Sequence, residues 1–136
     1  MNIRSGLSIL GLAASLACGG GGGGGSSSYS APPPPPADTV YVGGAASGYN
    51  GTETTAFYPF NQTTTAGHTI TWKWSPGITM MHNVTSGTPA GGPDGVFASP
   101  SQSSGPDFTH TFATAGTYHY YCTIHGSAMT GTITVN

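Results

Sequence analysis

The chain has 136 residues and a formal net charge of −2, and only 4% of its residues are charged. This length is enough for one domain. Arg4 and Lys73 are its only Arg and Lys residues, so the sequence has no basic patch and nucleic acid is excluded as an expected partner. Short runs of Thr, Val, Ile and aromatic residues between Gly, Pro and Ser predict an all-β domain, and no stretch has a sustained helical period.

The first 18 residues are typical of a bacterial export signal. Arg4 precedes an apolar segment, residues 7–17, which is too short to span a bilayer. Cys18 follows directly, and its surroundings resemble a bacterial lipoprotein signal, in which cleavage before the cysteine leaves it to be lipidated. We therefore expect residues 1–18 to be a signal peptide ending in a lipidated Cys18. The alternative is an ordinary secretory signal that is removed together with Cys18. Both place the mature domain outside the cytoplasm, in the periplasm or at the cell surface.

Residues 19–37 have a composition that cannot bury a core. Seven consecutive glycines occupy residues 19–25, and five consecutive prolines occupy residues 32–36. The Gly/Ser part predicts flexible coil, and the prolines predict a stiff polyproline II spacer of roughly 15 Å. We expect a disordered tether that holds a domain, residues 38–136, away from a membrane.

The first half of this domain contains two clear strand patterns. Residues 39–42 predict a short strand, and residues 69–74 give the cleanest alternation in the chain, with the Ile and both Trp side chains on the face expected to meet the core. Pro59 lies between two phenylalanines and indicates a sheet edge or a crossing between sheets. Residues 43–55 are polar and contain glycine, and they predict no regular element.

The second half adds further short strands. Residues 87–95 and 98–106 are rich in Gly, Pro and Ser and predict loops, and residues 113–116 predict a turn. With about seven or eight short strands in total, the pattern is typical of an antiparallel Greek-key β-sandwich or barrel. The strands expected in this half are residues 81–86, 108–112, 117–122 and 131–136.

The loop after residues 117–122 carries three soft metal donors. They are the Cys122 thiolate, the His125 imidazole and the Met129 thioether. Cys122 is the only cysteine in residues 38–136, so it has no intrachain disulfide partner there. Because an unprotected thiol is readily oxidised outside the cytoplasm, a metal bond would explain its presence.

These donors lack a second imidazole. Two imidazoles and one thiolate, with a weak axial thioether, hold copper for electron transfer, and the missing imidazole must come from a distant strand. His82 is the best candidate, because it opens an expected strand after the turn at residues 76–77. His68 lies in a predicted turn, His110 has the inward parity of its phenylalanine neighbours, and His119 is expected to point outward. None of these three is assigned to copper.

Several segments resemble the plastocyanin-like and amicyanin-like cupredoxins. The C-terminal signature is a Cys-Thr-Ile-His sequence with a methionine shortly after it, and the N-terminal histidine ligand of the family is matched by His-Asn-Val. The resemblance covers residues 57–136 well and residues 38–56 weakly. The matching segments are residues 66–72, 82–84, 116–122, 122–125 and 129–135.

The resemblance implies a role for each matching residue. Asn83 would brace the ligand loop near Thr123, and the edge of His125 would be the electron port. One departure is the spacing of three residues between His125 and Met129, where the family commonly has two or four. The loop length still permits the thioether to reach the metal. The implied ligands are His82, Cys122 and His125 in the equatorial plane and Met129 in the axial position.

The sequence therefore predicts a mononuclear type 1 (blue) copper protein that carries electrons outside the cytoplasm, with one copper ion cycling between Cu(I) and Cu(II). We do not expect an enzyme, because the loop lacks the second cysteine of a binuclear centre and the chain lacks the His-x-His clusters of multicopper enzymes. The alternative is a copper-binding protein of the same fold for copper delivery, storage or resistance. We expect a monomer, tethered through Cys18, that docks by an apolar patch to a redox partner such as a cytochrome or a terminal oxidase.

Overall fold

The computed structural model of the chain describes residues 36–44 and 54–136. The expected signal peptide, nearly all of the expected tether and most of residues 43–55 lie outside the described residues. In the part of the chain that is described, no helix is long and apolar enough to cross a membrane.

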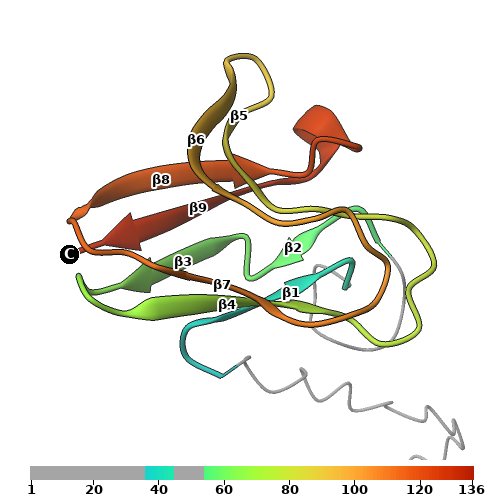
Figure 1. Ribbon diagram of the computed structural model, residues 1–136, viewed down its shortest axis with the longest axis horizontal. Helices are drawn as coiled ribbons and strands as arrows, with labels where there is room; N and C mark the ends of the chain where they lie inside the picture. Colours follow the sequence, from blue (N-terminus) through green and yellow to red (C-terminus); the bar gives the residue numbers. More distant parts are fainter. Residues whose placement is uncertain (1–35, 45–53) are drawn as a thin grey trace, which may run out of the picture.

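The described residues form two β-sheets (Figure 1). One sheet has four strands in the order β2-β1-β4-β7, and the other has five in the order β3-β9-β8-β5-β6. This confirms the expected all-β sandwich. The elements are β1 (Thr39–Val42), β2 (Phe57–Tyr58), β3 (Asn61–Thr64), β4 (Thr69–Trp74), β5 (Thr85–Thr88), β6 (Gly92–Ala98), β7 (Phe108–Thr111), β8 (Gly116–Tyr121), the short 3-10 helix η1 (Gly126–Ala128) and β9 (Thr130–Val135).

The pairing differs from a purely antiparallel arrangement in one strand pair of each sheet. β1 runs parallel to β4, with Val42 opposite Trp74, and β3 runs parallel to β9, with Thr64 opposite Val135. The other strand pairs are antiparallel. Parallel partners need a long connection, and both pairs join strands that are far apart in the chain. Side-chain alternation predicts strands but carries no signal for this distant pairing.

The chain passes from one sheet to the other at Pro59, as its sequence predicts. β2 lies at an edge of the first sheet and β3 at an edge of the second. The Tyr58–Pro59 peptide bond between them is cis. Phe57, just before the crossing, is buried in the core, whereas Phe60, just after it, is 58% exposed.

β5 and β6 form a hairpin where the sequence predicts a loop. The Ser86 hydroxyl accepts hydrogen bonds from the backbone N–H groups of Val96 (3.0 Å) and Phe97 (2.9 Å) and donates one to the Asp94 carboxylate. The bond from Ser86 lowers the pKa of Asp94. Gly87, with φ 117°, lies where the strand register shifts. Because side-chain bonds replace part of the regular ladder here, hydrophobic alternation does not reveal β6.

Trp72 lies in the core between the sheets. It is fully buried, as the alternation of β4 predicts. Its ring centroid is 5.5 Å from that of Tyr120 and 5.3 Å from that of Phe97, and such ring pairs contribute about 0.5–1.5 kcal/mol each beyond area burial. The core cluster consists of Val40, Val42, Phe57, Ile70, Trp72, Trp74, Ile78, Val84, Phe97, Phe112, Tyr120, Cys122, Met129, Ile133 and Val135. Two of the expected donors, a thiol and a thioether, therefore belong to the core itself.

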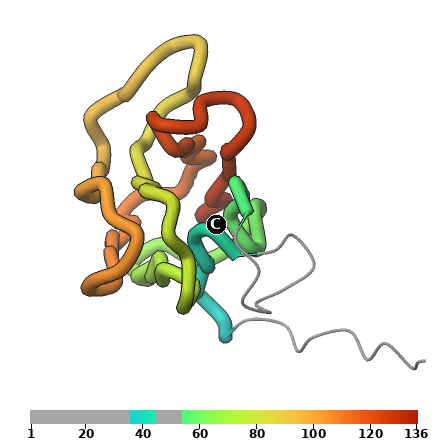
Figure 2. Tube along the Cα trace, turned by 90° about the vertical axis from the view of Figure 1, so that its right-hand side faces the viewer, coloured from blue at the N-terminus to red at the C-terminus, as the bar shows by residue number. Residues whose placement is uncertain are grey.

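The two ends of the sandwich carry different features. At the end where β1 begins and β9 finishes, the Asp38 carboxylate accepts a hydrogen bond from Thr64 Oγ1 (2.9 Å) and lies 3.3 Å from His68 Nδ1. β8 starts beside the end of β9 and runs to the opposite end. Figure 2 faces that opposite end, where the red-orange loop after β8 lies beside the yellow-green segment before β5. The ligand loop and the start of the domain are thus at opposite ends.

Candidate metal centre

The loop after β8 folds around the Cys122 carbonyl group. Cys122 follows the last residue of β8, and its side chain is fully buried. Its carbonyl oxygen accepts hydrogen bonds from the backbone N–H groups of His125 (3.2 Å) and Gly126 (2.9 Å), and its own N–H donates to the Met129 carbonyl oxygen (3.0 Å). Gly126 has a positive φ of 54°, which glycine adopts without steric cost. The turn therefore keeps His125 beside Cys122 and closes the loop at Met129.

The second histidine comes from the segment between β4 and β5. His82 N–H donates to the Gln102 carbonyl oxygen (3.0 Å), and Gln102 N–H donates to the His82 carbonyl oxygen (2.9 Å). The strand expected from residue 81 begins only at Thr85, so this isolated bridge fixes the His82 backbone instead. The imidazole is fully buried.

The structure brings the side chains of His82, Cys122 and His125 together. Their ligand atoms all lie within 4.8 Å of one another. Cys122 Sγ is 3.4 Å from His125 Nδ1, and the centroids of the two imidazoles are 4.8 Å apart, with ring planes inclined by 42°. His82 and Cys122 are buried and His125 is half-buried, so one edge of the cluster reaches the surface.

This donor set fits a soft transition-metal ion. Atoms bonded to one ion at about 2.0–2.3 Å lie at most about 4.6 Å apart, so the separations observed are close to those that a shared ion requires. One thiolate with two imidazoles suits copper, whereas Mg²⁺ and Ca²⁺ prefer carboxylate and carbonyl oxygens. The described part of the chain places no Asp or Glu in this cluster.

Asn83 joins the two segments that carry the donors. Its Nδ2 donates to Thr123 Oγ1 (2.7 Å) and to Ser101 Oγ (3.1 Å), and its Oδ1 accepts a hydrogen bond from Thr123 N–H (2.8 Å). Its backbone N–H donates to Cys122 Sγ at 3.5 Å. Partners of this kind orient metal ligands. Here they link the segment of His82 to the loop of Cys122.

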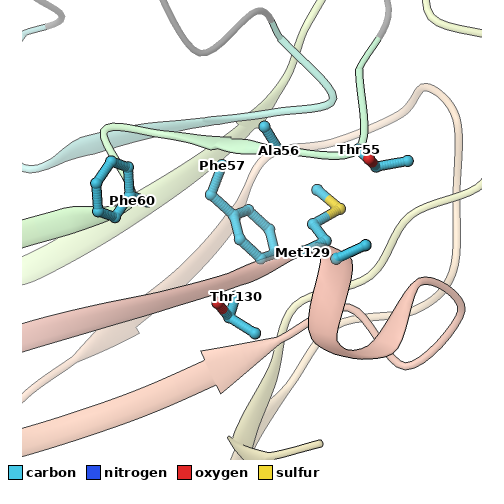
Figure 3. A pocket seen from close by; sticks show the side chains of 7 residues that line it. Thr55, Ala56, Phe57, Phe60, Met129 and Thr130 are labelled. Carbon is cyan, nitrogen blue, oxygen red and sulfur yellow. The ribbon is translucent and has the colours of Figure 1, made fainter.

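Met129, between η1 and β9, is fully buried. Figure 3 shows its side chain pointing toward Ala56, at a hollow of about 210 Å³ beside the crossing between the sheets. Its assignment as the axial donor stays a prediction. The hollow is lined by Thr55, Ala56, Phe57, Phe60, Ala128, Met129 and Thr130.

The other three histidines lie outside the cluster. His68 is at the opposite end of the sandwich, beside Asp38. His110 is half-buried and packs against Phe97, with ring centroids 4.9 Å apart, and burial lowers its pKa. His119 is exposed on β8.

Two residues that contact His82 were not singled out from the sequence. One is Gln102, which binds the His82 backbone through its own backbone, so its side-chain type gives no signal. The other is Gly43, directly after β1, where an added Cβ would lie 3.0 Å from His82 Nε2. Such contacts depend on the folded path of the chain.

Large apolar side chains are exposed next to the donors in the sequence. Met80 and Met81 precede His82 and are 37% and 47% exposed. Ile124 precedes His125 and is 50% exposed. Each histidine of the cluster therefore directly follows an exposed apolar residue in the sequence.

Comparison with known proteins identifies the class. A family model described as copper binding proteins of the plastocyanin/azurin family matches residues 45–136. A purple cupredoxin from Nitrosopumilus maritimus is similar in structure, with 28% identity, a TM-score of 0.57, and coverage of 72% of this chain and 98% of that chain. Oxidised plastocyanin from Dryopteris crassirhizoma has 32% identity, a TM-score of 0.52, and coverage of 72% and 99%. Amicyanin from Paracoccus versutus has 25% identity, a TM-score of 0.53, and coverage of 76% and 84%. A search of curated protein sequences gave no match.

The β-sandwich and its thiolate–imidazole cluster define a cupredoxin. The chain belongs to the plastocyanin/azurin family of copper-binding proteins, since the family match covers most of its length and the fern plastocyanin is 32% identical over 99% of that chain. This confirms the resemblance inferred from the sequence. Copper is the cofactor that this family and this cluster of donors imply.

Proposed function

We propose that the protein is a mononuclear type 1 copper protein that carries electrons between partner proteins. In this proposal His82, Cys122 and His125 are the equatorial copper ligands and Met129 is the axial ligand. The observation that carries it is the convergence of one thiolate and two imidazoles within 4.8 Å at one end of a packed core. Thiolate and thioether suit Cu(I), and imidazole suits both oxidation states.

The chain's own contribution is to hold these donors in one arrangement. When bound, copper supplies one-electron exchange between Cu(I) and Cu(II). Cys122 and Met129 are part of the hydrophobic core, and the backbone of His82 is bonded in both directions to Gln102. Close-packed interiors keep side chains in fixed positions. Little ligand movement is therefore needed when an electron is gained or lost.

The half-buried edge of His125 is the proposed point of contact with a redox partner. His82 and Cys122 are fully buried, so His125 is the donor of this cluster nearest to solvent. Met81 and Ile124, which directly precede the two histidines in the sequence, have exposed side chains, and we propose that they supply apolar docking area. We take a cytochrome or a terminal oxidase as the partner class. Because the proposal includes no substrate, we assign no enzymatic activity.

We further propose that the domain is a monomer that works outside the cytoplasm and is tethered to a membrane through lipidated Cys18. The export-type segment at residues 1–18 and the Gly/Pro composition of residues 19–37 support this location. Cys122 is a free, buried cysteine. Its use as a copper ligand is compatible with an oxidising compartment, where a free thiol needs protection.

The test is the spectrum of the purified mature protein loaded with Cu(II). We expect an intense visible thiolate-to-copper band and a narrow copper hyperfine splitting in electron paramagnetic resonance. Cys122→Ser is expected to remove both features, because the thiolate produces them. A protein that binds copper without the band would contradict an electron carrier and favour storage or delivery. A band that survives in Cys122→Ser would contradict the ligand assignment.

A further inference from the structure

Gly43 lies against one edge of the His82 imidazole. An ideal Cβ at Gly43 would be 3.0 Å from His82 Nε2, 3.1 Å from His82 Cδ2 and 2.9 Å from Ile78 Cδ1. These distances are shorter than van der Waals contact between such atoms. The backbone φ of Gly43 is +73°, in the left-handed region that favours glycine. Space and backbone conformation therefore both require glycine at this position.

The backbone of Gly43 is held independently of His82. Gly43 N–H donates to the Ala56 carbonyl oxygen, and the Gly43 carbonyl oxygen accepts from Thr54 N–H, both at 3.0 Å. The preceding residue, Val42, is fully buried and pairs with Trp74 across the parallel strands β1 and β4. Gly43 is thus a fixed surface against which the imidazole packs.

This contact limits the orientations that the His82 imidazole can adopt. The Nε2–Cδ2 bond is the part of the ring next to Gly43, and Nδ1 is the ring atom opposite that bond. The His82 backbone is held by its two hydrogen bonds to Gln102, so the ring cannot withdraw by a shift of the main chain. Packing against Gly43 therefore directs Nδ1 away from Gly43 and restricts rotation of the imidazole.

We propose that Gly43 is a positioning residue for His82, whose close backbone approach sets the direction in which His82 presents Nδ1 to copper. This inference rests on the proposed copper site. Gly43 contributes no donor in this inference, and it acts only through the imidazole. Changes in residues that orient metal ligands typically cost 10–100-fold in metal affinity, which is the scale of effect expected here.

The chain offers matched controls for this inference. Gly67 and Gly77 also have positive φ, +88° and +80°, but an ideal Cβ at either one meets nothing within 4 Å. Their alanine variants introduce comparable backbone strain without a steric contact. Ile78→Val removes Cδ1, so the double variant Gly43→Ala/Ile78→Val isolates the contact with His82.

The experiment loads the mature protein and each variant with copper and measures the visible band, the hyperfine splitting and the copper affinity by competition with a chelator. We expect every glycine-to-alanine variant to lower the melting temperature of the copper-free protein. Only Gly43→Ala is expected to change the spectra and to weaken copper affinity, by about 10-fold or more. The double variant is expected to keep the altered spectra.

Three results separate the possibilities. Suppose that the wild type shows the visible band. If Gly43→Ala then has the same spectra and copper affinity as Gly67→Ala, the inference is overturned. Recovery in the double variant would assign the effect to Ile78 and would also overturn it. A wild type without the band contradicts the proposed function instead. Should Gly43→Ala not fold, Gly43→Asn replaces it, because asparagine adopts positive φ more readily and carries the same Cβ.

Discussion

At the scale of single residues, Met129 is expected to adjust the reduction potential of the centre, while the other ligands determine its visible band. It is fully buried, and its carbonyl oxygen accepts a hydrogen bond from Cys122 N–H. In a trigonal copper site the axial thioether is a weak donor that tunes the reduction potential. Three residues separate His125 from Met129, where the family commonly has two or four, so the contribution of the thioether is tested directly.

We expect Met129→Leu to keep the visible band and to raise the reduction potential. Leucine fills a similar volume but donates no electron pair. Although sulfur suits Cu(I), the loss of any electron-pair donor destabilises the doubly charged Cu(II) more than Cu(I), so the oxidised state loses more stabilisation. Visible spectroscopy and voltammetry measure the two properties. Met81→Leu, which replaces an exposed methionine, is the control and is expected to leave the potential nearly unchanged. Loss of copper binding in Met129→Leu would contradict a weak axial role.

The sequence predicted that His82, Cys122 and His125 come together, because their chemistry is distinctive, and the structure groups them; Met129 as a donor stays a prediction. A single cysteine at a strand end, followed by His125 and Met129, has few uses other than metal binding. His82 lies far from this loop in the sequence. It was predicted because it opens an expected strand after the turn at residues 76–77, and the family resemblance supports the same choice. Gly43 was not predictable, because it is one of 23 glycines. Its role comes from its φ and from a contact with a residue far along the chain, neither of which has a local sequence signal.

At the scale of elements, the centre depends on a link between two loops from different parts of the chain. The segment before β5 supplies His82, and the loop between β8 and β9 supplies Cys122 and His125. The Asn83 side chain spans them through two hydrogen bonds to Thr123. Both loops are therefore expected to open together when this link is lost.

We expect Asn83→Ala to lower the free energy of unfolding of the copper-free protein by about 2 kcal/mol, because it removes these hydrogen bonds and leaves the Thr123 N–H without its acceptor. Urea denaturation measures this change. Asn61→Ala on the exposed side of β3 is the control and is expected to stay within about 0.5 kcal/mol of wild type. Equal stability of the two variants would show that the link contributes nothing.

Strands were predictable where one face packs on the core. In β4 every second side chain is buried, and the sequence shows the same alternation of apolar and polar residues. β6 has Phe97 as its only buried residue, so its sequence has no alternation of apolar and polar residues. Two of its backbone N–H groups donate to the Ser86 hydroxyl. The parallel pairs were missed for another reason. Register between distant strands is set by the packing of the whole sandwich and not by either strand alone.

At the scale of the whole molecule, the start of the domain and the copper donors lie at opposite ends. Asp38, the first residue of the expected domain, is fixed by its contacts with Thr64 and His68. β8 carries Cys122 to the other end. Among the described residues, the point where the expected tether joins the domain is therefore far from the donor end.

We expect the chain, expressed in a bacterium, to incorporate a labelled fatty acid at Cys18 and to fractionate with membranes. Lipidation requires the thiol, so Cys18→Ser should remove the label. Gel fluorescence of an alkyne-labelled fatty acid and membrane fractionation measure the two outcomes, with Cys122→Ser as a control that should keep the label. A soluble, unlabelled wild type would refute the anchor and leave the ordinary secretory signal.

If Cys18 is lipidated as proposed, attachment at the Asp38 end would change how often the protein meets a partner in the same membrane. Residues 19–37 span at most about 65 Å when fully extended, so a lipidated chain would explore only a thin layer above the membrane. Restriction to this layer would raise the concentration of the chain beside any partner in the same membrane above that of a chain spread through the whole compartment. At such concentrations a weak, short-lived complex is enough for frequent encounters. Docking through exposed apolar side chains such as Ile124 would then not depend on the charge steering that speeds the encounters of freely diffusing proteins.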